Sequence, residues 1–465
     1  MIDSLARLLA FLPHFFPPYF SLPYLRALLT PLGETIQMAA GGIIVAIIVG
    51  LLTGIWIGAG LPGSRLVYTA LASLRSIPDL TLAIFCVVIV GIGPAAGMMA
   101  LALFYSAAVG KIFADLFLAA DPEPIEALRA TGAGRLSVAL FGHLPLRLKD
   151  ILSYGSYEFE SAVRASVIVG AVGGGGLGTE IVGTINAFDY KRTTTLLIVL
   201  ILLIAVIDRF AHFLKRQPRI LWFVLPLAAL AFWHNRPASV SVVHAANTFA
   251  TMFPPQLPGN AVRQIPQLLL ETFEIAFGGT FFAIIAGLPL GLCAARNLSP
   301  AILHVPIRRF LEALRAIPEV IWGLVFVTAI GIGPEAGVFA LALHTTGSLG
   351  RLYAESFENV PLDPVRAVAA TGAGPVSIAA FAFVPLALAP MAVHTLFRLE
   401  WNVRAATIVG VIGAGGIGGA LFNAQQLFFY KQMMAYIAIT WLLVLAVDSA
   451  SSHFRRRMKL MEVYE

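Results

Sequence analysis

Long apolar runs alternate with short polar segments along the chain. Each run holds about 20 residues or more, the length that an α-helix needs to cross the hydrocarbon core of a bilayer. The pattern predicts membrane spans at residues 34–60, 66–92, 97–118, 147–172 and 192–213, and again at 270–295, 309–332, 337–358, 387–412 and 432–453. We therefore expect an all-α, polytopic membrane protein.

The last five predicted spans repeat the first five. Arg75-Ser-Ile-Pro-Asp79 returns as Arg315-Ala-Ile-Pro-Glu319, an offset of 315 − 75 = 240 residues. Glu34-Thr35 matches Glu271-Thr272 at an offset of 237, so a small length change lies in between. Similarity at a nearly constant offset indicates a duplication. The sequence thus predicts two homologous five-span halves.

An odd number of spans in each half requires one further crossing between halves of the same orientation. Residues 219–235 are apolar and carry Trp222 and Trp233 near their ends, where side chains of this kind meet the membrane interface. They predict an extra span and about eleven in total, whereas repeated prolines argue against a twelfth span in residues 1–30. We expect an external lead-in at 1–33, a first half at 34–216, a linker with the extra span and a second lead-in at 217–266, a second half at 267–456 and a cytoplasmic tail at 457–465.

Composition supports the membrane class and excludes others. Hydrophobic residues make up 58% and charged residues 12% of the chain, about half the charged fraction of soluble domains. The net charge of +6 could indicate nucleic acid, but the basic residues lie largely at span ends, as in cytoplasmic loops. We therefore expect no nucleic-acid partner. Cys86 and Cys293 are far apart in apolar segments and predict neither a disulfide nor a metal site. The N-terminus does not match a cleaved signal peptide.

Two polar stretches interrupt the apolar chain, Asp121–Pro145 and its copy Asp363–Pro385. Asp121 is placed to cap a short helix that begins at Pro122, and Gly132 suits the helix end. A polar stretch between spans must face water. We interpret both stretches as surfaces that a soluble partner binds, with a plain connecting loop as the alternative.

Ionisable residues inside the predicted spans include Arg75, Glu160 and Arg164 in the first half, and Arg315, His344, Glu400 and Arg404 in the second. Charges at membrane depth are costly and are commonly functional. A Glu and an Arg four residues apart can pair on one helix face, and the planar guanidinium suits an oxyanion. Two interpretations stay open. The arginines line a path for an anion, or the pairs only neutralise each other inside the bundle.

Glycine-rich runs at Gly170–Gly178 and Gly410–Gly419 follow the fourth span of each half. They lack the Gly-Lys-Ser/Thr ending of a phosphate-binding loop, so we expect a bend or a close helix contact at an external gate. The residues of this gate are Gly173, Gly176, Gly413 and Gly416. The sequence contains no nucleotide-binding motif, catalytic triad or metal-ligand cluster. We expect a transport protein that is not itself an enzyme.

Glu126-Ala127-Leu128, Gly132 and Leu144-Pro145 resemble the EAA loop of ABC-importer permeases of the binding-protein-dependent class. In that family the loop is the coupling helix that docks on the ATP-binding subunit. The second copy differs, because Arg366 stands where the first copy has Glu126. The resemblance implies coupling residues Asp121, Glu126, Ala127 and Gly132 in the first half, and Asp363, Arg366, Ala367 and Gly372 in the second.

Five further segments together are similar to the phosphonate-type permeases: Leu314–Glu319, Gly331–Pro334, Ala340–His344, Asn402–Thr407 and Val411–Gly418. That resemblance implies a type I ABC importer fold, crossing the bacterial inner membrane in contact with lipid. The substrate would be a phosphonate, phosphite, hypophosphite or phosphate. The implied partners are two ATP-binding subunits on the cytoplasmic side, which hold ATP and Mg, and an external or periplasmic substrate-binding protein. The chain itself would need no cofactor.

Two alternatives stay open. Methionine-type permeases share the Arg-Ser-Ile-Pro and Gly-Ala-Gly-Gly elements, so an importer of an amino acid such as methionine, or of an osmoprotectant, also fits. An ion-driven secondary transporter would instead need acidic or Asn/Ser-lined ion sites near the bilayer midplane.

Overall fold

The computed structural model describes residue 7, residues 10–216 and residues 242–457. These residues form helices, turns and loops, with no strand among them. They group into two compact units, one of His14–Pro254 and one built mainly from Pro255–Glu465. The all-helical class expected from the apolar runs is confirmed for the described part of the chain.

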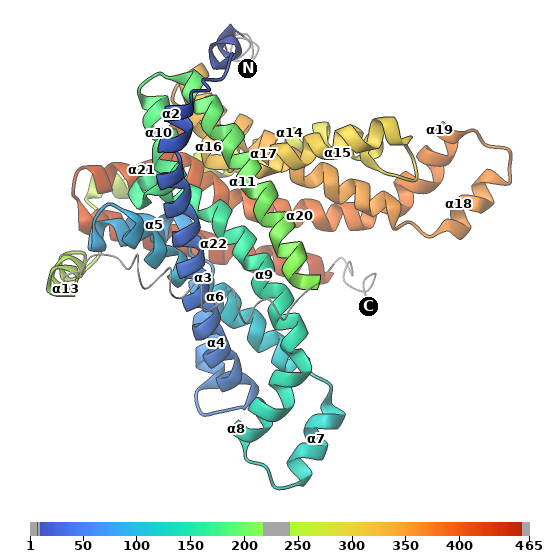
Figure 1. Cartoon of the computed structure of the whole chain (residues 1–465), viewed down its shortest axis with the longest axis horizontal. Helices are drawn as coiled ribbons and strands as arrows, with labels where there is room; N and C mark the ends of the chain where they lie inside the picture. The colour runs from blue at the N-terminus through green and yellow to red at the C-terminus, as the bar shows by residue number, and fades with distance from the viewer. Residues whose placement is uncertain (1–6, 8–9, 217–241, 458–465) are drawn as a thin grey trace. The chain divides into compact units, whose positions relative to one another are not determined.

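Both units contain the same order of helices (Figure 1). The first unit contains α2 (Leu22–Ala27), α3 (Leu29–Gly58), α4 (Ser64–Leu74), α5 (Asp79–Val90), α6 (Pro94–Leu118), α7 (Pro122–Ala130), α8 (Arg135–Val138), α9 (Leu144–Val169), α10 (Gly176–Asn186), α11 (Tyr190–Arg216) and α13 (Val242–Thr251). The second contains α14 (Gly259–Ala294), α15 (Ala301–Ala316), α16 (Glu319–Ile330), α17 (Pro334–Glu358), α18 (Leu362–Ala369), α19 (Pro375–Ile378), α20 (Val384–Val409), α21 (Gly416–Gln426) and α22 (Tyr430–Arg457). The predicted repeat is thus a structural repeat, with α3 to α11 matched by α14 to α22.

The long helix pairs α3–α6 and α14–α17 form the core of each unit. Small residues let their backbones approach closely. A Cβ atom added at Gly42 of α3 would lie 2.7 Å from Cβ of Leu101, and one at Gly279 of α14 would lie 2.6 Å from Cβ of Leu341. At these two positions a larger side chain would force the helices apart.

The second predicted span of each half is not one straight helix. α4 and α5 meet at a bend of 92°, and α15 and α16 at a bend of 84°. Pro78 and Pro318 follow directly on these breaks, and a residue before proline is driven out of the helical conformation. A straight helix through either region is therefore excluded, whereas a span at 66–92 and at 309–332, each built from two helices, stays a prediction.

Six of the described helices are long and apolar enough to cross a membrane, or up to nine segments if each bent pair counts as one span. The more polar α17 is not among them, although the pattern predicts a span at 337–358 and α17 packs on α14 as α6 packs on α3. Residues 219–235 lie outside the described residues. The total of about eleven spans stays a prediction.

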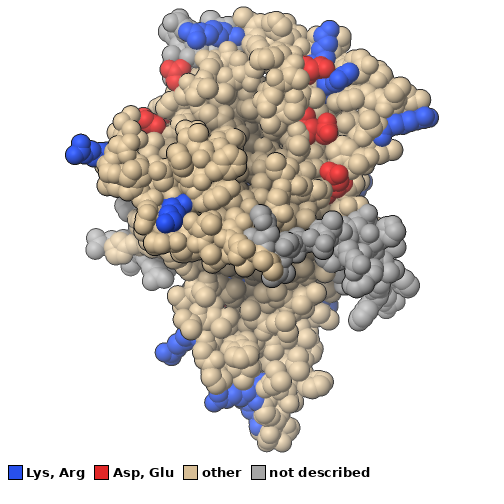
Figure 2. All heavy atoms as spheres, turned by 90° about the vertical axis from the view of Figure 1, so that its left-hand side faces the viewer, with Lys and Arg blue, Asp and Glu red and all other residues tan. Residues whose placement is uncertain are grey.

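Large apolar side chains cover much of the surface, and charged side chains are sparse on the face that Figure 2 shows. Phe277, Phe281 and Ile285 follow one another at four-residue intervals on α14 and are 54%, 58% and 55% exposed. A stripe of this kind is unfavourable in water. It fits contact with lipid.

Candidate functional site

The polar loop of the first unit folds into two short helices, α7 and α8, at the opposite end of the unit from α10 (Figure 1). The carboxylate of Asp121 accepts a hydrogen bond from the N–H of Glu123 at 3.2 Å, so the predicted cap is confirmed. Gly132 has φ +82° directly after the last turn, a left-handed position that favours glycine. Ile125 alone of α7 is buried, while Glu126 and Ala127 are exposed.

The equivalent loop of the second unit, α18 and α19, differs from the first in the residue that precedes its first helix. α18 begins at Leu362, so Asp363 lies in its first turn and does not cap the helix as Asp121 caps α7. At the 240-residue offset Asp363 matches Glu123, and Pro361 matches Asp121. Asp363 forms an exposed ion pair with Arg366 at 3.7 Å. Gly372 has φ +80°, matching the first copy.

The two loops share a pattern of burial. In residues 121–130 and 361–370, the fifth residue is buried, the eighth is half-buried and all others are exposed. Each loop also presents one large aromatic side chain to solvent, Phe141 at 74% exposed and Phe381 at 76%. Each therefore forms an exposed surface with one buried anchor, Ile125 or Val365.

The arginines of the first half lie close to buried acids. Arg164 and Glu160 of α9 form the expected ion pair, with Nη1 and Oε1 2.5 Å apart. Arg75 ends α4 at the bend, so it does not lie within a straight span. Glu158, which sequence reasoning missed, is 7% exposed, accepts a hydrogen bond from Tyr154 and feels the charges of Arg75 and Arg164. It brings the two arginines into one electrostatic cluster.

The charged side chains of the second half have different partners from those of the first half. Arg404 of α20 forms an ion pair with Asp448 of α22 at 3.5 Å, a contact between helices that the spacing to Glu400 did not predict. His344 lies 3.7 Å from the carboxylate of Glu319, and its Nδ1 is 3.0 Å from the carbonyl of Ile317. Arg315 lies in the last turn of α15, at the bend.

A buried polar network joins three helices of the second unit. The amide of Asn402 donates to Oγ1 of Thr280 at 2.8 Å and accepts from Oγ1 of Thr345 at 2.9 Å. The 240-residue offset places Ala162 and Tyr105 where the second half has Asn402 and Thr345. The network is therefore a property of the second half.

The glycine-rich runs form the expected bend, 57° between α9 and α10 in the first unit. Gly176 has φ +73°, and an added Cβ would lie 2.6 Å from Oγ1 of Thr35. The N–H of Gly176 donates to the carboxylate of Glu34 at 2.9 Å, and the N–H of Leu177 to Oγ1 of Thr35 at 2.8 Å.

The second unit repeats these contacts. The N–H of Gly416 donates to Glu271 at 3.0 Å, and that of Ile417 to Thr272 at 3.1 Å. A glutamate thus occupies the N-terminus of α10 and of α21, and its negative charge disfavours a phosphate there. Sequence reasoning used Glu34-Thr35 and Glu271-Thr272 only as markers of the repeat.

The loops Gly91–Pro94 and Gly331–Pro334 also join the bends. The N–H of Gly93 donates to the carbonyl of Gly173 at 2.8 Å, and that of Gly333 to Gly413 at 3.0 Å. In each unit the glycine run therefore connects the end of the fourth-span helix, α9 or α20, to the first long helix, α3 or α14, and to the loop before α6 or α17.

This architecture defines a class: a duplicated, polytopic membrane protein with charged groups inside its helix bundles and a pair of exposed loops. A profile described as "Binding-protein-dependent transport system inner membrane component" matches residues 42–220 and 287–460, well over half of the chain. The chain belongs to this family of permeases.

Two relatives illustrate the duplication. The chain is 29% identical over 483 residues to the phosphate-import permease protein PhnE of Mycolicibacterium smegmatis, covering 98% of this chain and 90% of that protein. It is 34% identical over 239 residues to the phosphite transport system permease protein PtxC of Stutzerimonas stutzeri, covering 51% of this chain and 84% of that protein. A solved structure of the MetNI methionine ABC transporter in an inward-facing conformation aligns with 43% of this chain and 99% of its own, at 21% identity and a TM-score of 0.40.

Proposed function

We propose that this chain is the permease of an ATP-driven importer for a phosphorus oxyanion: phosphonate, phosphite, hypophosphite or phosphate. The observation that carries the proposal is the pair of exposed loops with matching burial, set in a chain of the binding-protein-dependent family. Relatives named for phosphate and phosphite transport support the substrate class. They disfavour methionine or an osmoprotectant, the main alternative.

Coupling to ATP hydrolysis runs through α7–α8 and α18–α19. Each loop projects polar and aromatic side chains, so that one ATP-binding subunit can bind each loop. The partner subunits hold ATP and Mg, and this chain takes no part in hydrolysis. The charges differ at one matched position, Glu126 against Arg366, so the two loops present unequal surfaces.

Arginines inside the two bundles act on the passing anion. Arg75 and Arg164 form a cluster with acids in the first half, and Arg404 pairs with Asp448 in the second. An arginine held by a carboxylate offers part of its charge to an oxyanion without binding it too tightly. The glycine bends at Gly173–Gly176 and Gly413–Gly416 act as the external gate, where a substrate-binding protein delivers its cargo.

The chain spans the inner membrane of a bacterium in this scheme, with the coupling loops in the cytoplasm. Lys and Arg at the ends of the helices near those loops support this orientation.

Uptake with a panel of substrates tests the proposal. The chain, its ATP-binding subunits and its binding protein are produced in a host that lacks uptake systems for phosphonate and phosphite. We expect uptake of at least one phosphorus oxyanion, and none of methionine or glycine betaine. Uptake of an amino acid or betaine in place of every phosphorus compound would overturn the proposed substrate class.

A further inference from the structure

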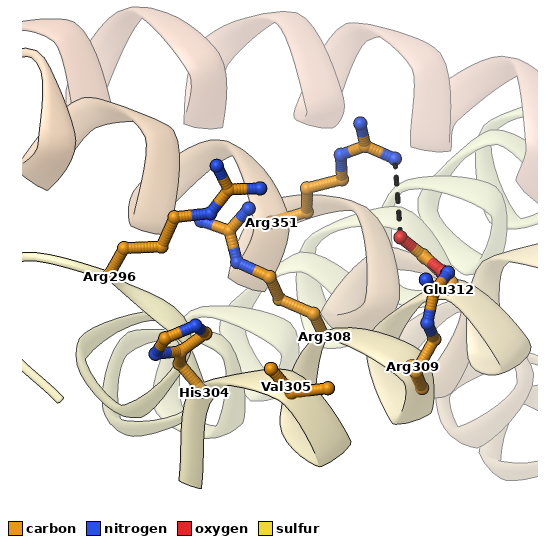
Figure 3. A pocket seen from close by; sticks show the side chains of 7 residues that line it. All are labelled: Arg296, His304, Val305, Arg308, Arg309, Glu312 and Arg351. Carbon is orange, nitrogen blue, oxygen red and sulfur yellow. Dashed lines mark hydrogen bonds and ion pairs between the residues drawn. The ribbon is translucent and has the colours of Figure 1, made fainter. Parts of the chain in front are cut away.

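A basic cavity of about 270 Å³ lies in the second unit, among the loop after α14, α15 and α17 (Figure 3). These elements share a hydrophobic cluster with Val365 of α18 and Ile378 of α19. The loop after α14 contributes Arg296, α15 contributes His304, Arg308, Arg309 and Glu312, and α17 contributes Arg351. Nothing in the importer mechanism above uses this cavity.

The basic groups outnumber the acids that hold them. Arg308 donates to Glu358 at 2.5 Å and to the carbonyl of Ala294 at 2.8 Å, which fixes its guanidinium. Arg309 pairs with Glu312 at 2.6 Å. Arg351 lies 3.0 Å from Glu355 and 4.0 Å from Glu312. Four guanidinium groups thus share three carboxylates.

Arg296 supplies the excess charge. Its backbone N–H donates to Glu358 at 2.7 Å, but its guanidinium forms no hydrogen bond or ion pair with any residue that the structure describes. The Nδ1 of His304 lies 3.0 Å from the carbonyl of Ser299, which orients the ring at the edge of the cavity. The guanidinium of Arg296 is therefore available to a ligand, and it lies beside the guanidinium of Arg308, whose position is fixed. Two guanidinium groups arranged in this way suit a phosphate group.

The first half has no such cluster at the equivalent positions. The 240-residue offset places Tyr68, Thr69 and Ala72 where the second half has Arg308, Arg309 and Glu312. Two equivalent positions carry a cation. Arg65 stands where the second half has Val305, and Lys111, which matches Arg351, is 2.8 Å from Asp115, to which Tyr68 also donates at 2.9 Å. The basic cavity is therefore an added feature of the second half and not part of the repeated core.

The apolar surroundings indicate the source of the anion. α15 turns by 84° from α16, and its side chains Ile302, Val305 and Phe310 are 87%, 50% and 51% exposed. Val305 itself lines the cavity. A helix with exposed apolar side chains beside basic groups is typical of one that lies in the membrane interface. Basic pockets between helices at the cytoplasmic surface bind the headgroups of anionic lipids.

We propose that this cavity binds the phosphate of an anionic phospholipid, with the acyl chains along the exposed apolar face of α15. The guanidinium of Arg296 and that of Arg308 hold the phosphate oxygens. Glu312 competes with the lipid for Arg309 and Arg351.

Native mass spectrometry of the complete transport complex tests this assignment. The delipidated complex is titrated with phosphatidylglycerol, with phosphatidylcholine and with inorganic phosphate. Arg296→Gln removes the unpartnered charge from an exposed side chain, so it leaves the fold intact. Arg263→Gln is the matched control, because Arg263 is also exposed but lies near the other end of α14.

We expect phosphatidylglycerol to bind more tightly than phosphatidylcholine, with affinity lowered about fivefold by Arg296→Gln, unchanged by Arg263→Gln and raised by Glu312→Gln. Equal effects of the two arginine variants would indicate general charge attraction and overturn the site. Binding of inorganic phosphate that displaces phosphatidylglycerol from the cavity would overturn the lipid as its source. Weaker lipid binding in Glu312→Gln would overturn the assigned competition.

Discussion

The pair of Glu160 and Arg164 separates the two interpretations of the charges inside the bundles. The side chains of Glu160 and Arg164 are 12% and 22% exposed, and their charged atoms lie 2.5 Å apart. Replacing only Arg164 by Met leaves the carboxylate of Glu160 in a largely buried place. Breaking a buried pair from one side costs about 3–5 kcal/mol, which we reduce to about 2–3 kcal/mol because both groups keep some contact with solvent.

The double variant Glu160→Leu with Arg164→Met removes both charges. Exchange of a buried ion pair for apolar side chains of similar volume is close to neutral, within about 1 kcal/mol, and the charge of Arg75 still acts on Glu158 in this variant. If the pair is only structural, this variant transports normally. If Arg164 acts on the anion, the variant is stable but inactive.

Three measurements on the purified complex decide between these outcomes. Thermal unfolding reports stability, co-purification of the ATP-binding subunits reports docking, and uptake into proteoliposomes reports transport. We expect the single variant to unfold at a lower temperature, and the double variant to unfold and dock as the unmodified chain does while its uptake falls to background. Normal uptake by the double variant would refute the role of Arg164 in the path.

Three other substitutions test separate parts of the structure. Gly176→Ala places a side chain on a backbone with φ +73° and against the hydroxyl of Thr35, so we expect the free energy of unfolding to fall by about 2 kcal/mol in thermal unfolding. Gly183→Ala is the control, because no atom lies within 4 Å of its added Cβ, and we expect it to change stability little. Asn402→Ala deprives two buried threonine hydroxyls of the amide between them, and we expect it to cost about 2 kcal/mol in the same measurement; an unchanged unfolding temperature would contradict the network. Phe141→Asp and Phe381→Asp place a charge on the exposed coupling surfaces, and we expect each to reduce co-purification of the ATP-binding subunits, to unequal extents; full retention by both would contradict the docking sites.

Features set by neighbouring residues could be predicted from the sequence. The helix cap at Asp121 follows from an acidic side chain before a proline at the first helical position, although the same pair at Asp363-Pro364 lies inside α18. The left-handed turns at Gly132 and Gly372 follow from the preference of glycine for this backbone conformation. The ion pair of Glu160 and Arg164 lies within one turn of a single helix.

Features that depend on tertiary contacts could not be predicted. Glu34 reaches the N–H of Gly176 across 142 residues, and Arg404 reaches Asp448 on another helix. A spacing of four residues suggests only partners on the same helix. Glu158 and Glu319 are 7% and 4% exposed, and this burial is not visible in the sequence.

The breaks in the helices at Arg75 and Arg315 could have been predicted from the prolines that follow them, but the hydropathy pattern did not indicate them. Apolar segments lie on both sides of Ile77-Pro78 and Ile317-Pro318. Hydropathy averaged over the length of a span therefore indicates one continuous span in each region. The residue before each proline, Ile77 or Ile317, is disfavoured in the helical conformation, and this preference predicts the break. The bend moves both arginines from within a straight span to the junction of two helices.

The driving force of transport distinguishes an ATP-driven permease from an ion-driven transporter. The chain is reconstituted into proteoliposomes with its ATP-binding subunits and binding protein, and uptake of labelled phosphite or phosphate is measured with ATP, without ATP, and with an imposed ion gradient alone. We expect uptake that requires ATP and the binding protein and does not respond to the gradient. Uptake driven by the gradient in the absence of ATP would contradict this expectation.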